Sequence, residues 1–308
     1  MVSPRDSRMN ATPTAVGEAG ARAEPGSLYV VATPIGNLRD LTLRGLDILA
    51  SVDIIAAEDT RITSTMLARH GIATRPRALH RHNEARQVDA LVDALAAGRS
   101  IALVSDAGTP AISDPGARLV RAVRDAGHRV VPIPGASAVA AAVSAAGLAA
   151  ERFAFIGFLP AQTKARRELL ATIASWPLAL VFYEAPHRIG DTLVQLASAF
   201  DGRRRITVAR ELTKMFETIA TMPLAEAPAW IAADANRSRG EFVLIVDAPS
   251  DDARLGATAA DADRLLGALL EELPPARAAR VAAAVTGQSR DALYARALAL
   301  QSRMPRPG

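Results

Sequence analysis

Short apolar runs alternate along most of the chain with longer segments of helical periodicity. Four runs have the length and composition of strands: "LYVVAT" (28–33), "DIIAAED" (53–59), "IALVSD" (101–106) and "HRVVPIP" (128–134). The segments between and after them have apolar positions three or four residues apart, as in helices: residues 41–52, 63–71, 83–98, 117–127 and 135–148. This alternation predicts an α/β domain with a mostly parallel sheet that is covered on both faces.

The same pattern restarts near residue 150. Further strand-like runs are expected at residues 153–160, 178–185, 204–212 and 241–248, with helices at 164–174 and 186–200. We therefore predict an N-terminal α/β domain over residues 27–150 and a second α/β domain with a mixed sheet over residues 151–249.

The two ends of the chain have a different character. Residues 1–26 lack the apolar segment of a secretory signal, and we expect a disordered leader there. Residues 250–260 are rich in Asp, Ala and Gly, which is typical of a linker. Three short helices are expected over residues 261–302, the last two joined at "TGQS" by a turn of helix-turn-helix length.

Composition narrows the class of protein. Half of the 308 residues are apolar, which supports a sizeable core, but no stretch approaches the roughly 20 apolar residues of a membrane span. Cysteine is absent, which excludes disulfides, thiolate metal sites and cysteine nucleophiles. These features are consistent with a reducing cytoplasm, and we expect a cytoplasmic protein.

The loops after the strands are rich in small and polar residues. Ligands of open α/β sheets bind beyond the carboxyl ends of the strands, where this chain has "TPIGN", "AEDTR", "SDAGTP", "PIPGASA", "FYEAPHR" and "ARELTK". Glycine and alanine let the backbone approach a ligand closely, and we expect Asp106 and Gly108 to contact one. Asp114, followed by Pro115, is interpreted as the N-cap of the next helix.

Other motifs are absent or weak. The chain contains neither G-x-G-x-x-G nor the phosphate-binding P-loop pattern, so a dinucleotide or P-loop site has no motif to support it. The five histidines form no tight cluster with carboxylates, and we expect no metal site. In "HRHNE" (80–84), Asn83 is interpreted as a helix cap.

Seven blocks together carry a family resemblance: "ATPIGNLRDLTLR", "AAEDTR", "HNE", "VSDAGTPAISDPG", "PIPGASA", "FYEAPHR" and "ARELTK". In this order and spacing, over residues 28–300, they resemble the ribosomal RNA small subunit methyltransferase I family, a branch of the tetrapyrrole methylases. The resemblance implies a homodimer of two-domain chains that bind S-adenosylmethionine in the cleft between the domains. It also implies methyl transfer to the ribose 2′-hydroxyl of a cytidine in the decoding region of 16S rRNA, within the small ribosomal subunit.

The resemblance also assigns residues to the cofactor. Corrin and porphyrin methylases have a G-G-D-P-type sequence where this chain has "SDAGTP", a departure characteristic of the ribosomal branch. The resemblance places Pro34, Ser137, Ala138, Glu184 and Leu212 at cofactor-lining positions. The same loops supply the other cofactor-binding residues that we expect: Ser105, Asp106, Ala107, Gly108, Tyr183 and Glu211.

Methyl transfer to a hydroxyl requires alignment of the two reactants and a group that helps the hydroxyl lose its proton. The catalytic candidates at the expected site are Glu58, Asp59, Asp106, Glu211 and Lys214. The sequence does not choose among them, and Asp59 could instead form a structural ion pair with Arg61.

The C-terminal segment is basic. Between Leu273 and Gly308 there are six arginines and one aspartate, a net charge of +5 against +4 for the whole chain. Arg277, Arg280, Arg290 and Arg296 are expected to contact RNA phosphates, although a solvated helix face is the alternative. A tetrapyrrole (corrin or porphyrin) C-methyltransferase would not need this segment, and a non-catalytic RNA-binding assembly factor would not need intact cofactor loops.

Overall fold

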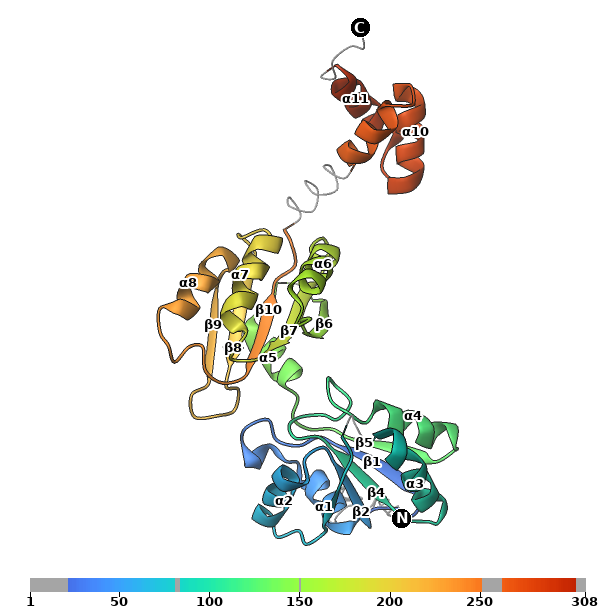
Figure 1. Ribbon diagram of the computed structural model, residues 1–308, viewed down its shortest axis with the longest axis vertical. Coiled ribbons are helices and arrows are strands. Elements are labelled where there is room, and N and C mark those ends of the chain that lie inside the picture. Colours follow the sequence, from blue (N-terminus) through green and yellow to red (C-terminus); the bar gives the residue numbers. More distant parts are fainter. Residues whose placement is uncertain (1–21, 81–83, 150, 251–261, 303–308) are drawn as a thin grey trace, which may run out of the picture. The chain divides into compact units, whose positions relative to one another are not determined.

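The computed structural model describes residues 22–80, 84–149, 151–250 and 262–302. The chain divides into two units between Ala141 and Ala142, and Figure 1 labels the elements along the chain. The division falls inside helix α5 (Ala138–Ala146). Among the described residues, no helix has the length and apolar character that crossing a membrane requires.

The first unit alternates strands and helices in the predicted order. Its elements are β1 (Ser27–Val31), the 3-10 helix η1 (Leu38–Asp40), α1 (Leu43–Ser51), β2 (Ile54–Ala57), α2 (Thr60–Arg69), β3 (Pro76–Ala78), α3 (Glu84–Ala96), β4 (Ile101–Val104), α4 (Ala117–Asp125) and β5 (Arg129–Ile133). The five strands form one sheet in the order β3-β2-β4-β1-β5, and every pair is parallel. The predicted parallel sheet is confirmed.

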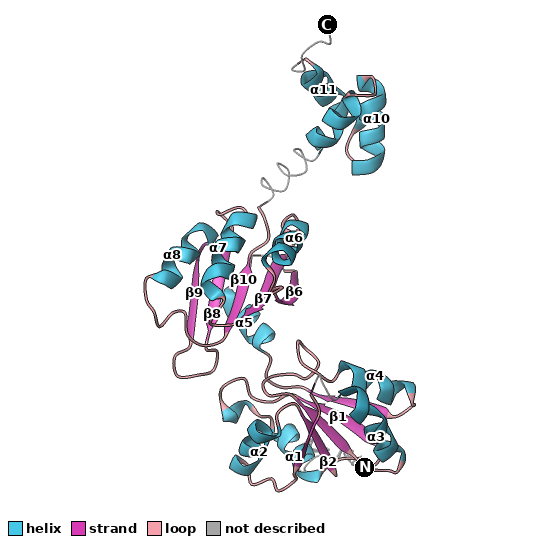
Figure 2. Cartoon of the chain, in the orientation of Figure 1, coloured by secondary structure: helices cyan, strands magenta, loops and turns pink. Residues whose placement is uncertain are grey.

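Burial on both faces explains why these strands are continuous apolar runs. In β2, Ile55 and Ala57 pack into one core cluster with residues of α1 and α2, whereas Ile54 and Ala56 pack into another with residues of α3 and α4. Parallel strands buried on both faces lose the polar alternation of a half-exposed sheet. Figure 2 shows the helices flanking this sheet.

The second unit has a mixed sheet, as predicted. Its elements are β6 (Phe153–Phe158), α6 (Thr163–Ile173), β7 (Ala179–Glu184), α7 (Ile189–Ala199), β8 (Arg205–Arg210), β9 (Thr218–Pro223), η2 (Leu224–Glu226), α8 (Ala227–Ala232) and β10 (Phe242–Val246). The strand order is β6-β7-β10-β8-β9; β6 and β7 are parallel and the other pairs are antiparallel. Apolar residues of α6, α7 and α8 pack with the central strands in one core cluster.

Three helices follow the segment 251–261, as predicted. They cover residues 262–270, α10 (Pro275–Thr286) and α11 (Arg290–Gln301). Their core is unusually rich in alanine: Ala278, Ala279 and Ala282 of α10 pack with Leu293 and Ala297 of α11. Because these side chains are small, the backbones of α10 and α11 can approach each other closely.

Of the two helix caps expected from the sequence, one is wrong and the other lies outside the described residues. Helix α4 begins at Ala117 with Gly116 as its N-cap, so the prediction that Asp114 caps the helix ahead of Pro115 is wrong. The φ of Gly116 is 120°, and an added Cβ would collide with Leu103 of β4. Glycine is therefore required there by both backbone and packing. Asn83, the other expected cap, lies outside the described residues.

Candidate active site

The loops after β1 and β4 are joined by backbone hydrogen bonds. The N–H of Thr33 donates to the carbonyl oxygen of Gly108 (2.9 Å), and the N–H of Gly108 donates to the carbonyl oxygen of Thr33 (3.0 Å). The Thr33 hydroxyl, which is buried, donates to the carbonyl oxygen of Ser105 at 3.0 Å. The two neighbouring strands thus end in a single connected loop structure.

The loop after β5 joins the same structure. Thr109 Oγ1 donates to the carbonyl oxygen of Ala136 at 3.2 Å. A Cβ on Gly108 would lie 3.3 Å from Ile35 Cγ2 and 3.7 Å from the Ala136 oxygen, so three loops converge around this glycine. Ser137 and Ala138 stand at the start of α5, where the Ser137 carbonyl accepts from the N–H of Ala141 at 2.9 Å.

The backbone of the "SDAGTPAISDPG" loop is unusual. Gly108 has a φ of 81°, and two non-glycine residues, Ala111 and Ser113, each have a φ of 66°. At the two non-glycine positions such a conformation costs about 1–3 kcal/mol and persists only where the surroundings impose it, whereas glycine adopts it without this penalty. The small residues of this loop let it turn sharply and leave its backbone near the converging loops, which is the geometry expected of a ligand-binding strand end.

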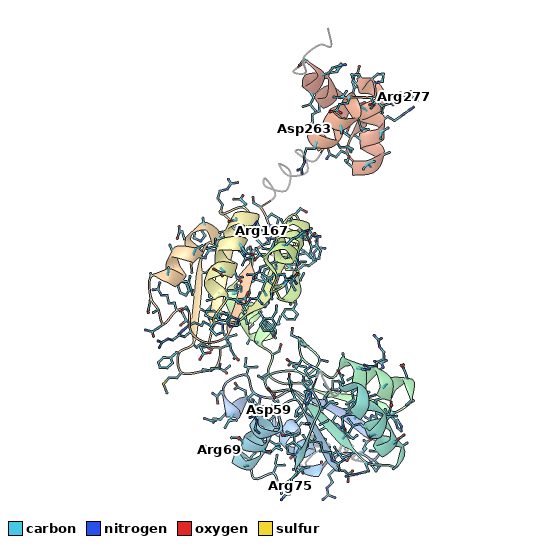
Figure 3. All side chains as sticks on the ribbon, viewed as in Figure 1. Asp59, Arg69, Arg75, Arg167, Asp263 and Arg277 are labelled. Atoms are coloured by element: carbon cyan, nitrogen blue, oxygen red, sulfur yellow. The ribbon has the colours of Figure 1, made fainter. Side chains whose placement is uncertain are left out.

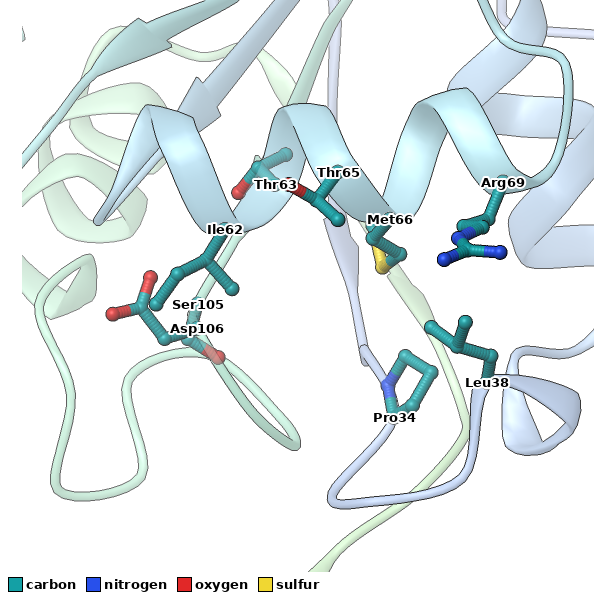
Figure 4. A pocket seen from close by; sticks show the side chains of 9 residues that line it. All are labelled: Pro34, Leu38, Ile62, Thr63, Thr65, Met66, Arg69, Ser105 and Asp106. Carbon is teal, nitrogen blue, oxygen red and sulfur yellow. The ribbon is translucent and has the colours of Figure 1, made fainter.

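A pocket of about 440 Å³ opens beside these loops. Its lining combines three predicted site residues with side chains of η1 and helix α2: Pro34, Leu38, Ile62, Thr63, Thr65, Met66, Arg69, Ser105 and Asp106. Figure 4 shows Asp106 and Arg69 at opposite ends of this set, with Met66 between them. The pocket therefore has an acidic end, a basic end and apolar walls.

The acidic end is ordered by hydrogen bonds to the start of α2. Asp106 Oδ1 accepts from the backbone N–H of Asp59 at 2.9 Å. Asp59 caps α2 by accepting from the N–H of Arg61 (2.8 Å), and it forms an ion pair with the Arg61 guanidinium (2.6 Å). That hydrogen-bonded guanidinium lowers the pKa of Asp59 to about 2. Asp59 and Arg61 therefore form the structural ion pair that was the alternative to a catalytic role for Asp59. Glu58, in the segment that joins β2 to α2, is half-buried.

In the second unit, Glu184 lies in a buried polar cluster. Its Oε2 accepts from Thr192 Oγ1 at 2.6 Å, and Arg188 forms an ion pair with Oε1 at 3.2 Å. Arg166, also buried, donates to Thr192 Oγ1 and to the carbonyl oxygens of Pro160 and Ala161. The Glu184 side chain is fully buried, and its partner Arg188 donates to the carbonyl oxygen of Leu159 in the loop after β6 at 2.7 Å.

Tyr183 lies next to this cluster but makes different contacts. Its ring packs edge-to-face on Phe155 and Phe158, with centroids 4.9 and 5.5 Å apart. The ring is half-buried.

The loop after β8 contains a second charged network. Lys214 Nζ lies 2.9 Å from Glu211 Oε1 and 2.9 Å from Glu241 Oε2. Glu211 has a φ of 53° and Thr213 a φ of 65°, so the loop is strained. Burial raises the pKa of Glu211, but hydrogen bonds from Lys214 and from the N–H of Glu241 outweigh burial, and the pKa lies below its usual range. Leu212 is buried.

The C-terminal arginines fall into two groups. Arg277, Arg280 and Arg290 are exposed. Arg296 is different, because its guanidinium forms a two-pronged ion pair with Asp263 that includes a 2.9 Å contact from Nη2 to Oδ2. The geometry gives Arg296 a structural partner that the sequence interpretation missed.

Within the described part of the chain, no group of three or more His, Asp or Glu side chains is arranged to hold a metal ion. Acidic side chains in the pocket and the loop after β8 are instead bonded to backbone N–H groups, Arg61 or Lys214.

Comparison with known proteins identifies the family. Residues 27–228 match the model of the Tetrapyrrole (Corrin/Porphyrin) Methylases, and residues 256–301 match the model of the RsmI C-terminal HTH domain. Proteins named ribosomal RNA small subunit methyltransferase I are similar over nearly their whole length. The protein from Pseudomonas aeruginosa is 47% identical over 90% of this chain and 99% of its own. That from Vibrio cholerae is 52% identical over 87% of this chain and 92% of its own. The chain belongs to the ribosomal RNA small subunit methyltransferase I family, within the tetrapyrrole methylases.

Solved structures agree on the fold. The cobalamin biosynthetic enzyme cobalt precorrin-4 methyltransferase has a TM-score of 0.56 at 16% identity, covering 72% of this chain and 95% of its own. The methyltransferase CobJ has a TM-score of 0.56 at 22% identity, covering 72% of this chain and 94% of its own. As a member of the ribosomal RNA small subunit methyltransferase I family, the chain is a methyltransferase.

Sequence reasoning missed one wall of the pocket. This wall includes Ile62, Met66 and Arg69 of α2, to which the sequence analysis assigned no role. The spacing of Ile62, Met66 and Arg69 by three or four residues places them on one face, and this was the available signal.

Proposed function

We propose that this methyltransferase uses S-adenosylmethionine to methylate the ribose 2′-oxygen of a cytidine in the decoding region of 16S rRNA. The observation that carries the proposal is the convergence of the loops after β1, β4 and β5 beside a pocket lined by the carboxylate of Asp106. The names of the family's members and the basic helical segment support ribosomal RNA as the substrate.

The residues present fit the cofactor. Gly108 leaves a space beside Ile35 and Ala136 that a Cβ would fill, so backbone groups can lie close to a bound molecule. Pro34, Ser105, Asp106, Ala107, Gly108, Ser137 and Ala138 would hold the cofactor within the first unit, while Tyr183, Glu184, Glu211 and Leu212 belong to the second unit. When bound, S-adenosylmethionine supplies an electrophilic methyl group.

Asp106 is the residue we assign to the proton of the 2′-hydroxyl. One carboxylate oxygen is held by the Asp59 N–H, and Oδ2 accepts no hydrogen bond from the described residues. Asp106 also lines the pocket, within reach of a molecule bound there. Asp59 is a poor base because its pKa is about 2, and Glu211 and Lys214 neutralise one another in their own loop. We propose that Glu184 positions the loop after β6.

The exposed arginines of α10 and α11 would bind RNA phosphates. Three of them form no ion pair with the described residues, so each can bind a phosphate without breaking one: Arg277, Arg280 and Arg290. Arg296 would contribute by joining α11 to the helix over residues 262–270 through Asp263. We further propose that the domains cover residues 27–150 and 151–249, followed by the helical segment 261–302. We also propose that the protein is a cytoplasmic homodimer. Light scattering on the purified chain tests the dimer.

Radiolabelled methyl transfer tests the proposal. The substrates are small subunits and naked 16S rRNA from a strain lacking the enzyme, and cofactor binding is measured in parallel by calorimetry. Label on subunits but not on naked rRNA is the expected result. Cofactor binding without label on either substrate would favour a tetrapyrrole substrate, and absence of cofactor binding would leave only a non-catalytic RNA-binding factor.

A further inference from the structure

We propose that the pocket along helix α2 binds the target nucleotide, with Arg69 binding one of its phosphates and Leu38, Ile62 and Met66 contacting its base and sugar. This inference rests on the function proposed above and names what the pocket holds. It adds Arg69, the last residue of α2, as a substrate-binding residue that the sequence analysis did not identify.

The walls suit a flat ring. Leu38 and Ile62 are large apolar side chains that remain 42% and 49% exposed, and the buried Met66, one turn after Ile62 on α2, also lines the pocket. A pocket of about 440 Å³ has room for a nucleoside. Apolar surface left open beside polar groups is typical of a ligand site.

The basic end suits a phosphate. Arg69 is exposed, and its guanidinium makes no hydrogen bond or ion pair with any residue that the structure describes. Figure 4 shows the guanidinium directed toward Leu38, at the far end of the pocket from Asp106. A planar guanidinium binds phosphate oxygens with two hydrogen bonds at once.

The order of groups in a nucleotide matches the order of groups in the pocket. A nucleotide in RNA has its 2′-hydroxyl and its phosphates at different positions around one ribose. With a phosphate at Arg69, the sugar lies along the apolar wall and the 2′-hydroxyl is directed toward Asp106.

Two exposed arginines provide a matched comparison. Arg69 lines the pocket and Arg75 does not, and both are labelled on the first unit in Figure 3. In steady-state methylation of small subunits, Arg69→Gln should raise the KM for subunits about tenfold. It should also reduce the slope of log KM against log salt by about one, as expected for one lost phosphate contact. Arg75→Gln should change neither, and both variants should bind S-adenosylmethionine as the unchanged chain does.

A second variant tests the apolar wall without changing charge. Ile62→Trp fills the pocket, and because Ile62 is half-exposed the helix should tolerate the larger side chain. We expect kcat/KM for subunits to fall at least tenfold while the melting temperature and cofactor affinity stay unchanged.

Three results would overturn the inference. Arg69→Gln could behave like Arg75→Gln, Ile62→Trp could methylate subunits normally, or either pocket variant could lose S-adenosylmethionine binding, which would assign the pocket to the cofactor. If the unchanged chain binds S-adenosylmethionine but methylates no subunits, the proposed function itself fails. That result is recognised before any variant is made.

Discussion

Thr33 and Gly108 exchange two backbone hydrogen bonds, of 2.9 and 3.0 Å, and so join the loops that follow strands β1 and β4. Pro34 and Asp106, both in the pocket lining, lie one and two residues from this bridge. The bridge fixes the backbone on two sides of the pocket before any ligand binds. Such preorganisation spares a binding site the cost of ordering its loops on each binding event.

Gly108→Ala should weaken both the fold and cofactor binding. The φ of Gly108 is 81° and an added Cβ would lie 3.3 Å from Ile35 Cγ2, so we expect a loss of about 2 kcal/mol in urea unfolding. Gly98→Ala is the matched control, because Gly98 has a φ of 80° with nothing within 4 Å of the added Cβ. Equal losses in the two variants, with unchanged cofactor affinity, would remove Gly108 from the site.

Glu84 caps helix α4 from another helix. Its Oε1 accepts from the N–H groups of Gly116 (3.1 Å) and Leu119 (3.4 Å). Glu84→Ala should cost about 1 kcal/mol of unfolding free energy, and Glu84→Gln should cost less because an acceptor oxygen remains. Hydrogen exchange of the Gly116 and Leu119 amides should speed up in the alanine variant alone; unchanged exchange would contradict the cap.

Removing the buried carboxylate of Glu184 should be severe. Glu184→Ala leaves Arg188 without its negative partner and Thr192 without the acceptor of its hydroxyl, and we expect a loss of about 3–5 kcal/mol in urea unfolding. Glu168, whose exposed side chain forms a 4.0 Å ion pair with Lys164, is the control, and Glu168→Ala should cost less than about 0.5 kcal/mol. A similar small cost for both variants would show that the cluster does not stabilise the second unit.

Arg61→Gln should raise the pKa of Asp59, which the hydrogen-bonded guanidinium of Arg61 now holds at about 2. A carboxyl group with a lowered pKa stabilises the fold above its unfolded pKa, and this contribution is lost as pH falls toward 2. The variant should therefore begin to unfold at a higher pH in acid. Carbon NMR titration of the Asp59 carboxyl measures the pKa directly, and an unchanged value would contradict the assignment.

The C-terminal arginines should separate into two roles. Changing Arg277, Arg280 and Arg290 together to Gln should raise the KM for subunits and lower its salt dependence while leaving the melting temperature unchanged. Arg296→Gln breaks the pair with Asp263 and should instead lower the melting temperature of the helical segment. If Arg296→Gln alone changed the salt dependence, Arg296 would be an RNA contact.

Most helices and strands could be predicted from the sequence because the burial of an element determines the spacing of its apolar residues. Strands β2 and β4 are buried on both faces, so each appears as a run of apolar residues. Short β3 (Pro76–Ala78) and α8 (Ala227–Ala232) were missed, since three or six residues with a proline carry too little periodicity to detect.

The site was less accessible to sequence reasoning because its key contacts are not local. The cap of α4 comes from Glu84, 32 residues before Gly116, and the chain reaches Gly116 through left-handed residues at Ala111 and Ser113. A local pattern pointed to Asp114 instead. Asp106 was recognised at its strand end, but its hydrogen bond to the Asp59 N–H and the role of Arg69 depend on how β4 and α2 pack.

Mass spectrometry of the nucleosides from subunits methylated in vitro tests the central claim most directly. Unchanged chain and the Asp106→Asn variant would each be incubated with S-adenosylmethionine and subunits from a strain lacking the enzyme. The account predicts 2′-O-methylcytidine from the decoding region with the unchanged chain, and a strongly reduced yield with the variant even at a saturating concentration of cofactor. A methyl group on the base rather than the ribose, or full yield from Asp106→Asn, would contradict it.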